Sequence, residues 1–371
     1  MKIGLVRRGY SATGGAERYL IRFAAGLEAR GHSCVLFSDR PWPSSAWGER
    51  EQITLKKGKS PGDFALALED SKPKQRCDFL FSLERVWRCD CYRAGDGVHA
   101  AWLERRARYE PKWRSVFRRL NLKHEQILRL EESLYGPKST AHLIANAAFV
   151  KAEITETYGT DPERITIIPN GFDAPALEPE AREVYREKGR RLYGLSPETV
   201  AFLFVGSGWE RKGLRFAIAS VETLANQGKA VRLFVAGKDK SPPRTRVPGV
   251  TEFLGPMAAT ELAQLYETSD VFILPTIYDP FSNACLEAAS HGLPVITTSA
   301  NGISELWPEL EGEIVPAPES PALIDACAAW LDPEKRVAAR PRNRAAAANH
   351  SVARNVEETL ACFETLIDRQ Q

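Results

Sequence analysis

Short apolar runs recur along the chain and are separated by longer stretches in which apolar and polar positions mix. The runs are four to seven residues long and rich in Val, Ile, Leu and Phe. This length and composition are typical of buried parallel strands. We therefore expect strands at 2–6, 34–37, 78–82, 142–146, 165–168, 200–205, 231–236, 251–255, 271–274 and 292–298.

Helical spacing dominates between these runs. Leu20, Phe23, Ala24 and Leu27 form one stripe, and a second lies near the C-terminus from Val352 to Ile367. Alternating strands and helices predict an α/β fold with Rossmann-like parallel-sheet units. A span rich in Glu, Arg and Pro follows the 165–168 strand, so we expect a first domain over 1–172, a second over 173–350 and a C-terminal helix over 351–371.

Composition narrows the class of protein. The chain has 371 residues, 43% of them hydrophobic, which suits two globular domains. No apolar run of 18 residues occurs, and the first strand begins at Lys2 without a signal-type segment. Seven Cys with no C-x-x-C pair fit a reducing compartment better than a disulfide framework. We expect a cytoplasmic protein.

Positive charge is concentrated in the first half of the chain. Residues 1–170 carry 29 Lys and Arg against 21 Asp and Glu. Between Trp102 and Arg129, basic residues alternate with apolar ones. The basic residues include Arg105, Arg106, Arg118 and Arg119, and the apolar ones include Trp113. Such a segment suits an anionic membrane surface or a polyanionic acceptor. A solvated basic helix is the alternative, and nucleic acid is not expected because no nucleic-acid module accompanies the segment.

Candidate chemistry is concentrated in the stretch 275–289, which follows the 271–274 run. Asp279 belongs to the predicted turn and Glu287 to about the second turn of the helix that follows. Backbone N–H groups of Phe281, Ser282 and Asn283 lie at the expected helix start, where an anion is favoured. Two carboxylates beside a phosphate site suit the hydroxyls of a nucleotide sugar. An N-capping Asp with a solvated Glu is the alternative.

A second candidate loop follows the 200–205 run. It reads Gly206-Ser207-Gly208-Trp209-Glu210-Arg211-Lys212-Gly213. Arg211 and Lys212 together can neutralise a diphosphate and the negative charge that develops on a departing phosphate oxygen. An exposed basic turn is the alternative.

Two further loops belong to the first half. Gly14 and Gly15 precede the first helix and would allow close approach of a phosphate or sugar oxygen; a flexible turn is the alternative. Asp96 and His99 share a Gly-flanked loop, where either side chain could contact a sugar hydroxyl or relay a proton. A lone His is also commonly structural.

Together these motifs and the 292–298 strand resemble the family-4 retaining glycosyltransferases, whose architecture, called GT-B, has two Rossmann-like domains facing across a cleft. Val205-Gly206-Ser207, Arg211-Lys212-Gly213, 237–240 and the 94–100 segment with Asp96 are most similar to the lipopolysaccharide-core glucosyltransferases of that family. The resemblance implies an acceptor-binding first domain, a donor-binding second domain, and a C-terminal helix that packs back on the first domain.

The resemblance also implies residue roles. Arg211 and Lys212 would grip the donor diphosphate, Asp279 the sugar hydroxyls and Glu287 the ribose. Asp279 stands where the family usually has Glu. The other donor-binding positions implied are Gly15, His99, Gly206, Met257 in the nucleobase loop, Phe281, Ser282 and Asn283, and Asp96 joins Arg211, Lys212 and Asp279 as a catalytic position.

The expected activity is hexosyl transfer from a UDP-sugar, first UDP-glucose, to a hydroxyl of an anionic glycolipid or glycan such as lipopolysaccharide core. No cofactor or metal is expected, because the sequence contains no D-x-D motif and the cations and helix N-termini of the chain would replace the metal. A GDP-mannose or UDP-N-acetylhexosamine transferase and a non-catalytic nucleotide-sugar-binding protein stay open. A nicotinamide oxidoreductase is disfavoured by the missing G-x-G-x-x-G.

Overall fold

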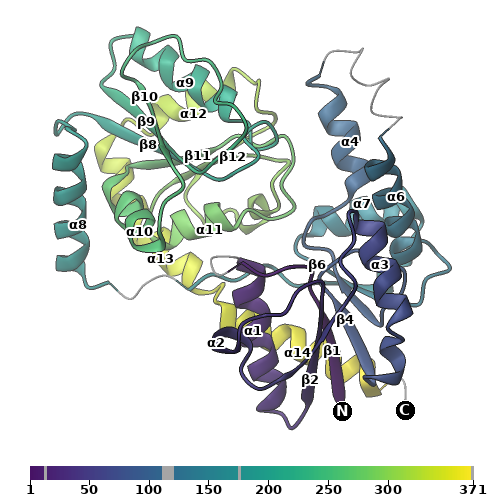
Figure 1. Ribbon diagram of the computed structural model, residues 1–371. Coiled ribbons are helices and arrows are strands. Elements are labelled where there is room, and N and C mark those ends of the chain that lie inside the picture. The colour runs from purple at the N-terminus through teal and green to yellow at the C-terminus, as the bar shows by residue number, and fades with distance from the viewer. Residues whose placement is uncertain (12–14, 111–120, 174–176, 369–371) are drawn as a thin grey trace. The chain divides into compact units, whose positions relative to one another are not determined.

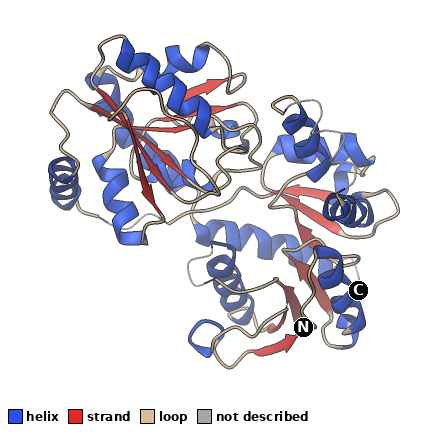
Figure 2. Ribbon diagram, turned by 45° about the horizontal axis from the view of Figure 1, so that its top comes forward, coloured by secondary structure: helices blue, strands red, loops and turns tan. Residues whose placement is uncertain are grey.

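The chain forms two compact units. The computed structural model describes residues 1–11, 15–110, 121–173 and 177–368. The first unit contains Met1–Pro169 and Val352–Gln371, and the second contains Asn170–Ser351. Helices cover both faces of the sheet in each unit (Figures 1 and 2). The predicted fold class of two Rossmann-like parallel sheets is therefore confirmed.

The first unit is built on a seven-stranded sheet in which every described pair is parallel. The strand order is β3-β2-β1-β4-β5-β6-β7, so the direction of winding reverses between β1 and β4. The strands are β1 (Lys2–Val6), β2 (Ser33–Ser38), β3 (Glu51–Thr54), β4 (Phe79–Ser82), β5 (Cys91–Arg93), β6 (His142–Ala145) and β7 (Ile165–Ile167).

Two apolar layers sandwich this sheet. Successive strand residues point to opposite faces, so that Leu5 joins the layer with α1 and α14 whereas Val6 joins the layer with α3 and α6. Phe363 of α14 packs its ring on Phe23 and Phe81. The helices are α1 (Gly15–Glu28), α2 (Ser44–Trp47), α3 (Pro61–Asp70), η1 (Pro73–Gln75), α4 (His99–Ala107), α6 (Leu122–Tyr135), α7 (Ala148–Tyr158), η2 (Pro162–Arg164) and α14 (Val352–Asp368).

The second unit repeats the design with six parallel strands. Their order is β10-β9-β8-β11-β12-β13, so the winding reverses between β8 and β11. The strands are β8 (Val200–Val205), β9 (Val231–Ala236), β10 (Thr251–Gly255), β11 (Val271–Leu274), β12 (Val295–Thr298) and β13 (Gly312–Val315). The helices are α8 (Pro179–Leu192), α9 (Leu214–Asn226), α10 (Ala259–Thr268), α11 (Asn283–Ser290), η3 (Gly302–Leu306), α12 (Ala322–Ala329) and α13 (Pro333–Ala348).

Helix α8 was not predicted, because its sequence lacks a strong apolar stripe. Three arginines at helical spacing attach it instead: Arg182 pairs with Glu267, and Arg186 and Arg190 pair with Asp270. Burial raises the pKa of Asp270, but Arg186 and Arg190 lower it, and the net shift of the pKa is downward. The span rich in Glu, Arg and Pro that follows the expected domain boundary therefore contains a helix held by buried charge pairs.

The cysteines and the helices bear on the predicted compartment of the protein. All seven cysteines are free thiols, and six of them are buried. Among the described residues, no helix is long and apolar enough to cross a membrane.

Candidate functional site

The two motif loops of the second unit meet at the point where the winding of its sheet reverses. The 206–213 loop follows β8 and the 275–282 loop follows β11, and these two strands are neighbours. Ligands of doubly wound sheets bind at the carboxyl ends of the strands, at such a switch point. The two loops therefore occupy the position where a ligand is expected in this class of fold.

Arg211 joins the two loops through both its backbone and its side chain. Its carbonyl oxygen accepts hydrogen bonds from Ile277 N (2.8 Å) and Thr276 Oγ1 (2.9 Å). Its guanidinium Nη1 donates to Tyr278 O at 3.0 Å. The cation is thus held against the 275–282 loop and is preorganised for a ligand at the switch point.

Asp279 lies beside both cations. Its carboxylate is 3.5 Å from Lys212 Nζ and 4.0 Å from Arg211 Nη1. Asp279 is buried, whereas the side chain of Arg211 is 35% exposed and that of Lys212 13% exposed. Two cations and one carboxylate leave one net positive charge, so these three side chains together attract an anion. The carboxylate of Asp279 can accept hydrogen bonds from hydroxyl groups next to that anion.

Two glycines make this close packing possible. Gly213 has a φ of +74°, and a Cβ there would lie 1.8 Å from Pro275 O. Gly206 has a φ of +146°, and a Cβ there would lie 2.8 Å from Lys212 Cδ. Any larger residue at either position would displace the 275–282 loop or the Lys212 side chain.

Asp239 braces the 206–213 loop from the next strand connection. Its carboxylate accepts from Trp209 N at 2.6 Å, and the Trp209 indole N–H donates to Gly206 O at 2.9 Å. Asp239 belongs to the 237–240 segment that carries part of the family resemblance, and no local sequence pattern indicates that it holds this loop.

The start of α11 offers fewer amides than the sequence suggested. Ser282 is the N-cap, and its backbone N–H donates to Asn301 Oδ1 at 3.1 Å. Of the described residues, none accepts a hydrogen bond from the backbone N–H of Phe281 or Asn283. These two amides stay available to an anion at a helix N-terminus, whereas that of Ser282 is occupied.

Asn301 was missed by sequence analysis. It is fully buried, its side chain also donates to Thr297 Oγ1 at 2.9 Å, and its backbone pairs with Asp279 in an isolated parallel bridge. It therefore fixes the loop between Asp279 and Ser282. A single Asn after a predicted strand carries no signal that distinguishes it from a turn residue.

The remaining donor-side predictions fall in the same unit. Glu287 is half-buried on α11, and burial together with the Glu287 carboxylate raises the pKa of the Tyr266 phenol. Met257 is half-buried after β10 and packs on the core of the unit. Burial raises the pKa of the Cys285 thiol to about 12, so this thiol beside Asp279 stays protonated at neutral pH.

In the first unit, Asp96 and His99 do not share a loop as predicted. Asp96 lies in the turn after β5 with its side chain 84% exposed, whereas His99 is the first residue of α4. The His99 ring shares a 2.9 Å hydrogen bond with His124. Burial and the nearby Arg85 lower the pKa of His99 to about 4, so the ring is neutral at physiological pH.

A buried ion pair holds this region and was not predicted. Arg85 Nη2 lies 2.9 Å from Glu131 Oε1, and the same nitrogen donates to Gly97 O at 2.9 Å. Glu131 also accepts from His99 N at 2.7 Å. The pair therefore fixes both the turn that carries Asp96 and the first residue of α4.

Gly15 is the first residue of α1, next to a group of charges after β1 and β4. Arg7 pairs with Glu17 (3.2 Å) and Glu84 (2.7 Å). Burial raises the pKa of Glu84, although Arg7 and Arg8 oppose the shift. This group lies at the switch point of the first sheet.

The basic segment is only partly covered by the structure. Arg105 pairs with Glu153 (2.7 Å) and Arg106 with Glu110 (2.6 Å). Trp113, Arg118 and Arg119 lie outside the described residues. Within the described ranges, no group of three or more His, Cys, Asp or Glu side chains is arranged to hold a metal ion.

Two parallel sheets with a basic loop and an acidic loop at the second switch point define a protein of the paired-Rossmann class. Comparison with known proteins gives the family. A model described as "Glycosyltransferase Family 4" matches residues 13–174, and one described as "Glycosyl transferases group 1" matches 199–332. The chain belongs to this family of glycosyltransferases, which confirms the resemblance stated above.

Curated relatives include an Escherichia coli (strain K12) protein, the lipopolysaccharide glucosyltransferase WaaG, which is 25% identical over 79% of this chain and 79% of its own length. A D-inositol 3-phosphate glycosyltransferase of Pseudarthrobacter chlorophenolicus is 29% identical over 62% of this chain and 57% of its own. The chain thus spans little more than half the length of the latter relative.

Solved structures support the GT-B fold. A crystal structure of WaaG has a TM-score of 0.75 at 21% identity and covers 96% of this chain and 98% of its own. The Anabaena protein Alr3699/HepE, crystallised with UDP and glucose, has a TM-score of 0.72 at 16% identity over 98% of this chain and 99% of its own.

Proposed function

We propose that the protein is a retaining glycosyltransferase that moves a hexose, glucose in the first instance, from a UDP-sugar to a hydroxyl of an anionic glycolipid or glycan. The observation that carries this proposal is the grouping of Arg211, Lys212 and Asp279 at one switch point. Cations there suit a diphosphate, and a carboxylate beside them suits the hydroxyls of the attached sugar.

The proposed reaction breaks the bond between the anomeric carbon and the diphosphate oxygen. The electron pair of that bond stays on the oxygen, where the charges of Arg211 and Lys212 stabilise it. The acceptor hydroxyl forms the new bond from the same face, and its proton passes to the departing phosphate oxygen. No side chain acts as the nucleophile, and no metal is required, so EDTA should leave turnover unchanged.

Other residues orient the two substrates in this scheme. Asp279 holds sugar hydroxyls, Glu287 the ribose diol, and the amides of Phe281 and Asn283 a phosphate or sugar oxygen. Asp96 contacts the acceptor from its exposed position. His99, neutral and hydrogen-bonded to His124, acts as a hydrogen-bonding group and not as a cation.

The donor is proposed from the similarity to WaaG, named as a lipopolysaccharide glucosyltransferase, and to HepE, crystallised with UDP and glucose. A thermal-shift screen of UDP-glucose, UDP-galactose, UDP-N-acetylglucosamine and GDP-mannose tests it. The largest stabilisation should come with UDP-glucose, because binding to the folded state alone raises the melting temperature. A larger shift with GDP-mannose would reassign the donor.

Transfer itself is tested by UDP release from UDP-glucose with lipopolysaccharide-core acceptors. Arg211→Ala should lower turnover about 100-fold or more while leaving the fold intact. Arg342→Ala is the matched control, because Arg342 is an exposed arginine of the same unit, paired with Glu311. Full activity of Arg211→Ala would contradict the diphosphate assignment, and donor binding without UDP release from any acceptor would favour a non-catalytic sugar-binding protein.

The anionic acceptor is proposed to be membrane-held, on the cytoplasmic face of the inner membrane. Sedimentation with anionic vesicles tests this, using a variant in which Arg105, Arg106, Arg118 and Arg119 are changed to Gln. Each basic side chain near an anionic surface contributes about 1 kcal/mol, so binding should fall steeply. Unchanged sedimentation of the variant would remove the membrane role of the segment.

A further inference from the structure

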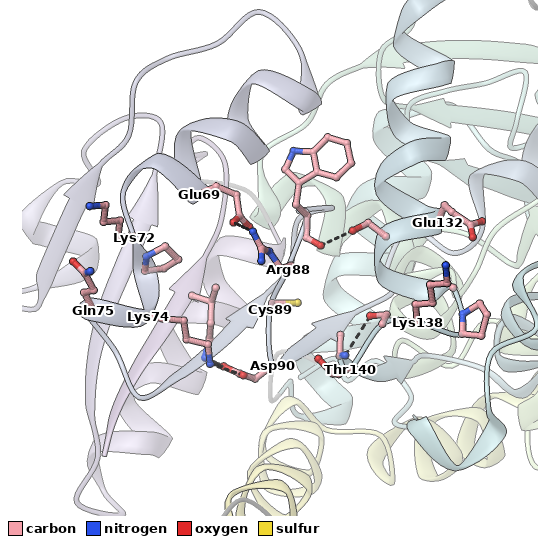
Figure 3. A pocket seen from close by; sticks show the side chains of 18 residues that line it. Glu69, Lys72, Lys74, Gln75, Arg88, Cys89, Asp90, Glu132, Lys138 and Thr140 are labelled. Atoms are coloured by element: carbon pink, nitrogen blue, oxygen red, sulfur yellow. Dashed lines mark hydrogen bonds and ion pairs between the residues drawn. The ribbon is translucent and has the colours of Figure 1, made fainter.

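A cavity of about 880 Å³ opens in the first unit, and neither Asp96 and His99 nor the charges around Arg7 line it. Its lining comes from η1, from the segment before β5, and from the end of α6 with the segment that leads to β6. Figure 3 shows Lys72, Lys74 and Gln75 on one side, Glu132 and Lys138 on the other, and Cys89 between them.

The cavity lies at the amino ends of the strands. Residues 87–90 and 136–141 directly precede β5 and β6, and residues 72–75 lie a few residues before β4. Asp96 and the charges around Arg7 follow the carboxyl ends of strands in the same sheet. A strand of four residues spans about 13 Å, so the cavity is a separate site from the edge where transfer is proposed.

The walls of the cavity are tied together by hydrogen bonds. Asp90 accepts from Leu80 N at 2.6 Å and pairs with Lys74. Ser133 Oγ donates to Trp87 O at 2.6 Å, which joins α6 to the segment before β5. Because these ties cross between elements, the cavity is preformed, and a ligand need not order it.

The lining combines three kinds of group. The half-buried Trp87 and two prolines, Pro73 and Pro137, offer apolar surface, and Ser139 and Thr140 offer hydroxyls. Four cations face three carboxylates: Lys72, Lys74, Arg88 and Lys138 against Glu69, Asp90 and Glu132.

The unpaired charges decide the class of ligand. Lys74 and Arg88 are already paired, with Asp90 and Glu69. Lys72, Lys138 and Glu132 have no ion-pair partner among the described residues. An indole and hydroxyls in one lining suit the C–H face and the hydroxyls of a sugar ring. The excess of one positive charge suits a carboxylate or phosphate substituent.

We propose that this cavity binds an anionic oligosaccharide of two or three sugar residues, with a sugar ring on Trp87 and the anionic substituent between Lys72 and Lys138. The ligand class rests on the proposed function, because a glycan acceptor extends beyond the residue that receives the hexose. Binding here would hold a remote part of the acceptor and raise its local concentration at the transferase.

The test is saturation-transfer NMR on the full chain with two trisaccharides of similar size, trigalacturonate and maltotriose. Trigalacturonate should bind at least about fivefold more tightly, because it alone carries carboxylates. Lys138→Glu should weaken trigalacturonate binding by about fivefold or more, and Trp87→Leu should weaken both sugars. Lys57→Glu, an exposed lysine of the same unit outside the cavity, is the charge-matched control.

The outcomes separate this site from the proposed function. Arg211→Ala should lower UDP release about 100-fold or more and leave trigalacturonate binding unchanged. An active transferase that binds neither trisaccharide would overturn the cavity proposal alone. Equal loss of binding in Lys138→Glu and Lys57→Glu would also overturn it, because the effect would then come from net charge and not from the cavity.

Discussion

Arg85 and Glu131 form an ion pair of 2.9 Å inside the first unit, and Glu131 is completely shielded from solvent. The pair is not an isolated contact. Glu131 also accepts from the backbone of His99 and from Tyr158 Oη at 2.8 Å, and Arg85 donates to Gly97 O. The carboxylate therefore has several donors, which offset the cost of removing it from water.

Glu131→Gln should destabilise the first unit strongly. The substitution removes the buried counter-charge of Arg85 and leaves only the exposed Asp96, 3.5 Å away. Breaking a buried pair in this way typically costs about 3–5 kcal/mol of the free energy of unfolding. Urea denaturation measures the change. Glu125→Gln is the control on the same helix, because Glu125 forms an exposed pair with Arg129 and should lose no more than about 0.5 kcal/mol. Equal losses in the two variants would contradict the role given to Glu131.

His99 should remain uncharged well below neutral pH. Its pKa in the folded protein is about 4, because of burial and Arg85, against about 6.5 in an unfolded chain. Between these values the unfolded state binds a proton that the folded state does not, so the free energy of unfolding falls as pH drops from about 6.5 to about 4. NMR titration of the His99 ring checks the pKa. His99→Gln should flatten the stability profile in this window, and an unchanged slope would contradict the assignment.

Most strands of the two sheets were predictable because parallel strands are buried on both faces. Runs such as 200–205 and 271–274 are therefore continuously apolar, and their local signal agrees with their final environment. Elements whose stability comes from distant partners gave no such signal. β3 is a short edge strand with polar residues, and α8 is attached through arginines whose carboxylates are 80 or more residues away.

The residues of the candidate site also fall into those that the sequence identified and those that it did not. Arg211, Lys212 and Asp279 were found because each belongs to a motif next to a predicted strand. Asn301 and Glu131 were not found, because each acts by accepting hydrogen bonds from backbone groups remote in sequence. Only the folded chain reveals such acceptors, since an Asn or Glu has no local feature that marks it as buried.

Gly213→Ala should test the close approach of the two motif loops. The residue has a φ of +74°, and its Cβ would overlap Pro275 O. Gly228→Ala is the matched control, with a φ of +78° and nothing within 4 Å of the added Cβ. The control should lose about 1–2 kcal/mol of stability from backbone strain alone, and Gly213→Ala clearly more. Urea denaturation compares the two, and equal losses would mean that the loops separate without cost.

Asn301→Ala should weaken both stability and donor binding. It leaves the buried N–H of Ser282 without an acceptor, which costs about 1–3 kcal/mol, and it removes the side-chain tie between Asn301 and the loop that carries Asp279. Urea denaturation and calorimetric titration with UDP-glucose measure the two effects. Asn226→Ala, at the exposed end of α9, should change neither. Unaltered UDP-glucose affinity in Asn301→Ala would show that this side chain does not position the site.

Asp279→Asn should affect UDP and UDP-glucose in opposite directions. The carboxylate offsets part of the charge of Lys212 and Arg211, at 3.5 and 4.0 Å, so its removal should strengthen UDP binding by up to about fivefold. The same change removes a charged acceptor for sugar hydroxyls, and a hydrogen bond to such an acceptor contributes about 1.5–3 kcal/mol. UDP-glucose should therefore lose affinity relative to UDP, and turnover should fall at least about 10-fold. Calorimetry with each ligand gives the ratio, and Asp325→Asn, an exposed aspartate of α12, controls for net charge. If the two affinities change by the same factor, Asp279 acts only through the diphosphate and does not hold the sugar.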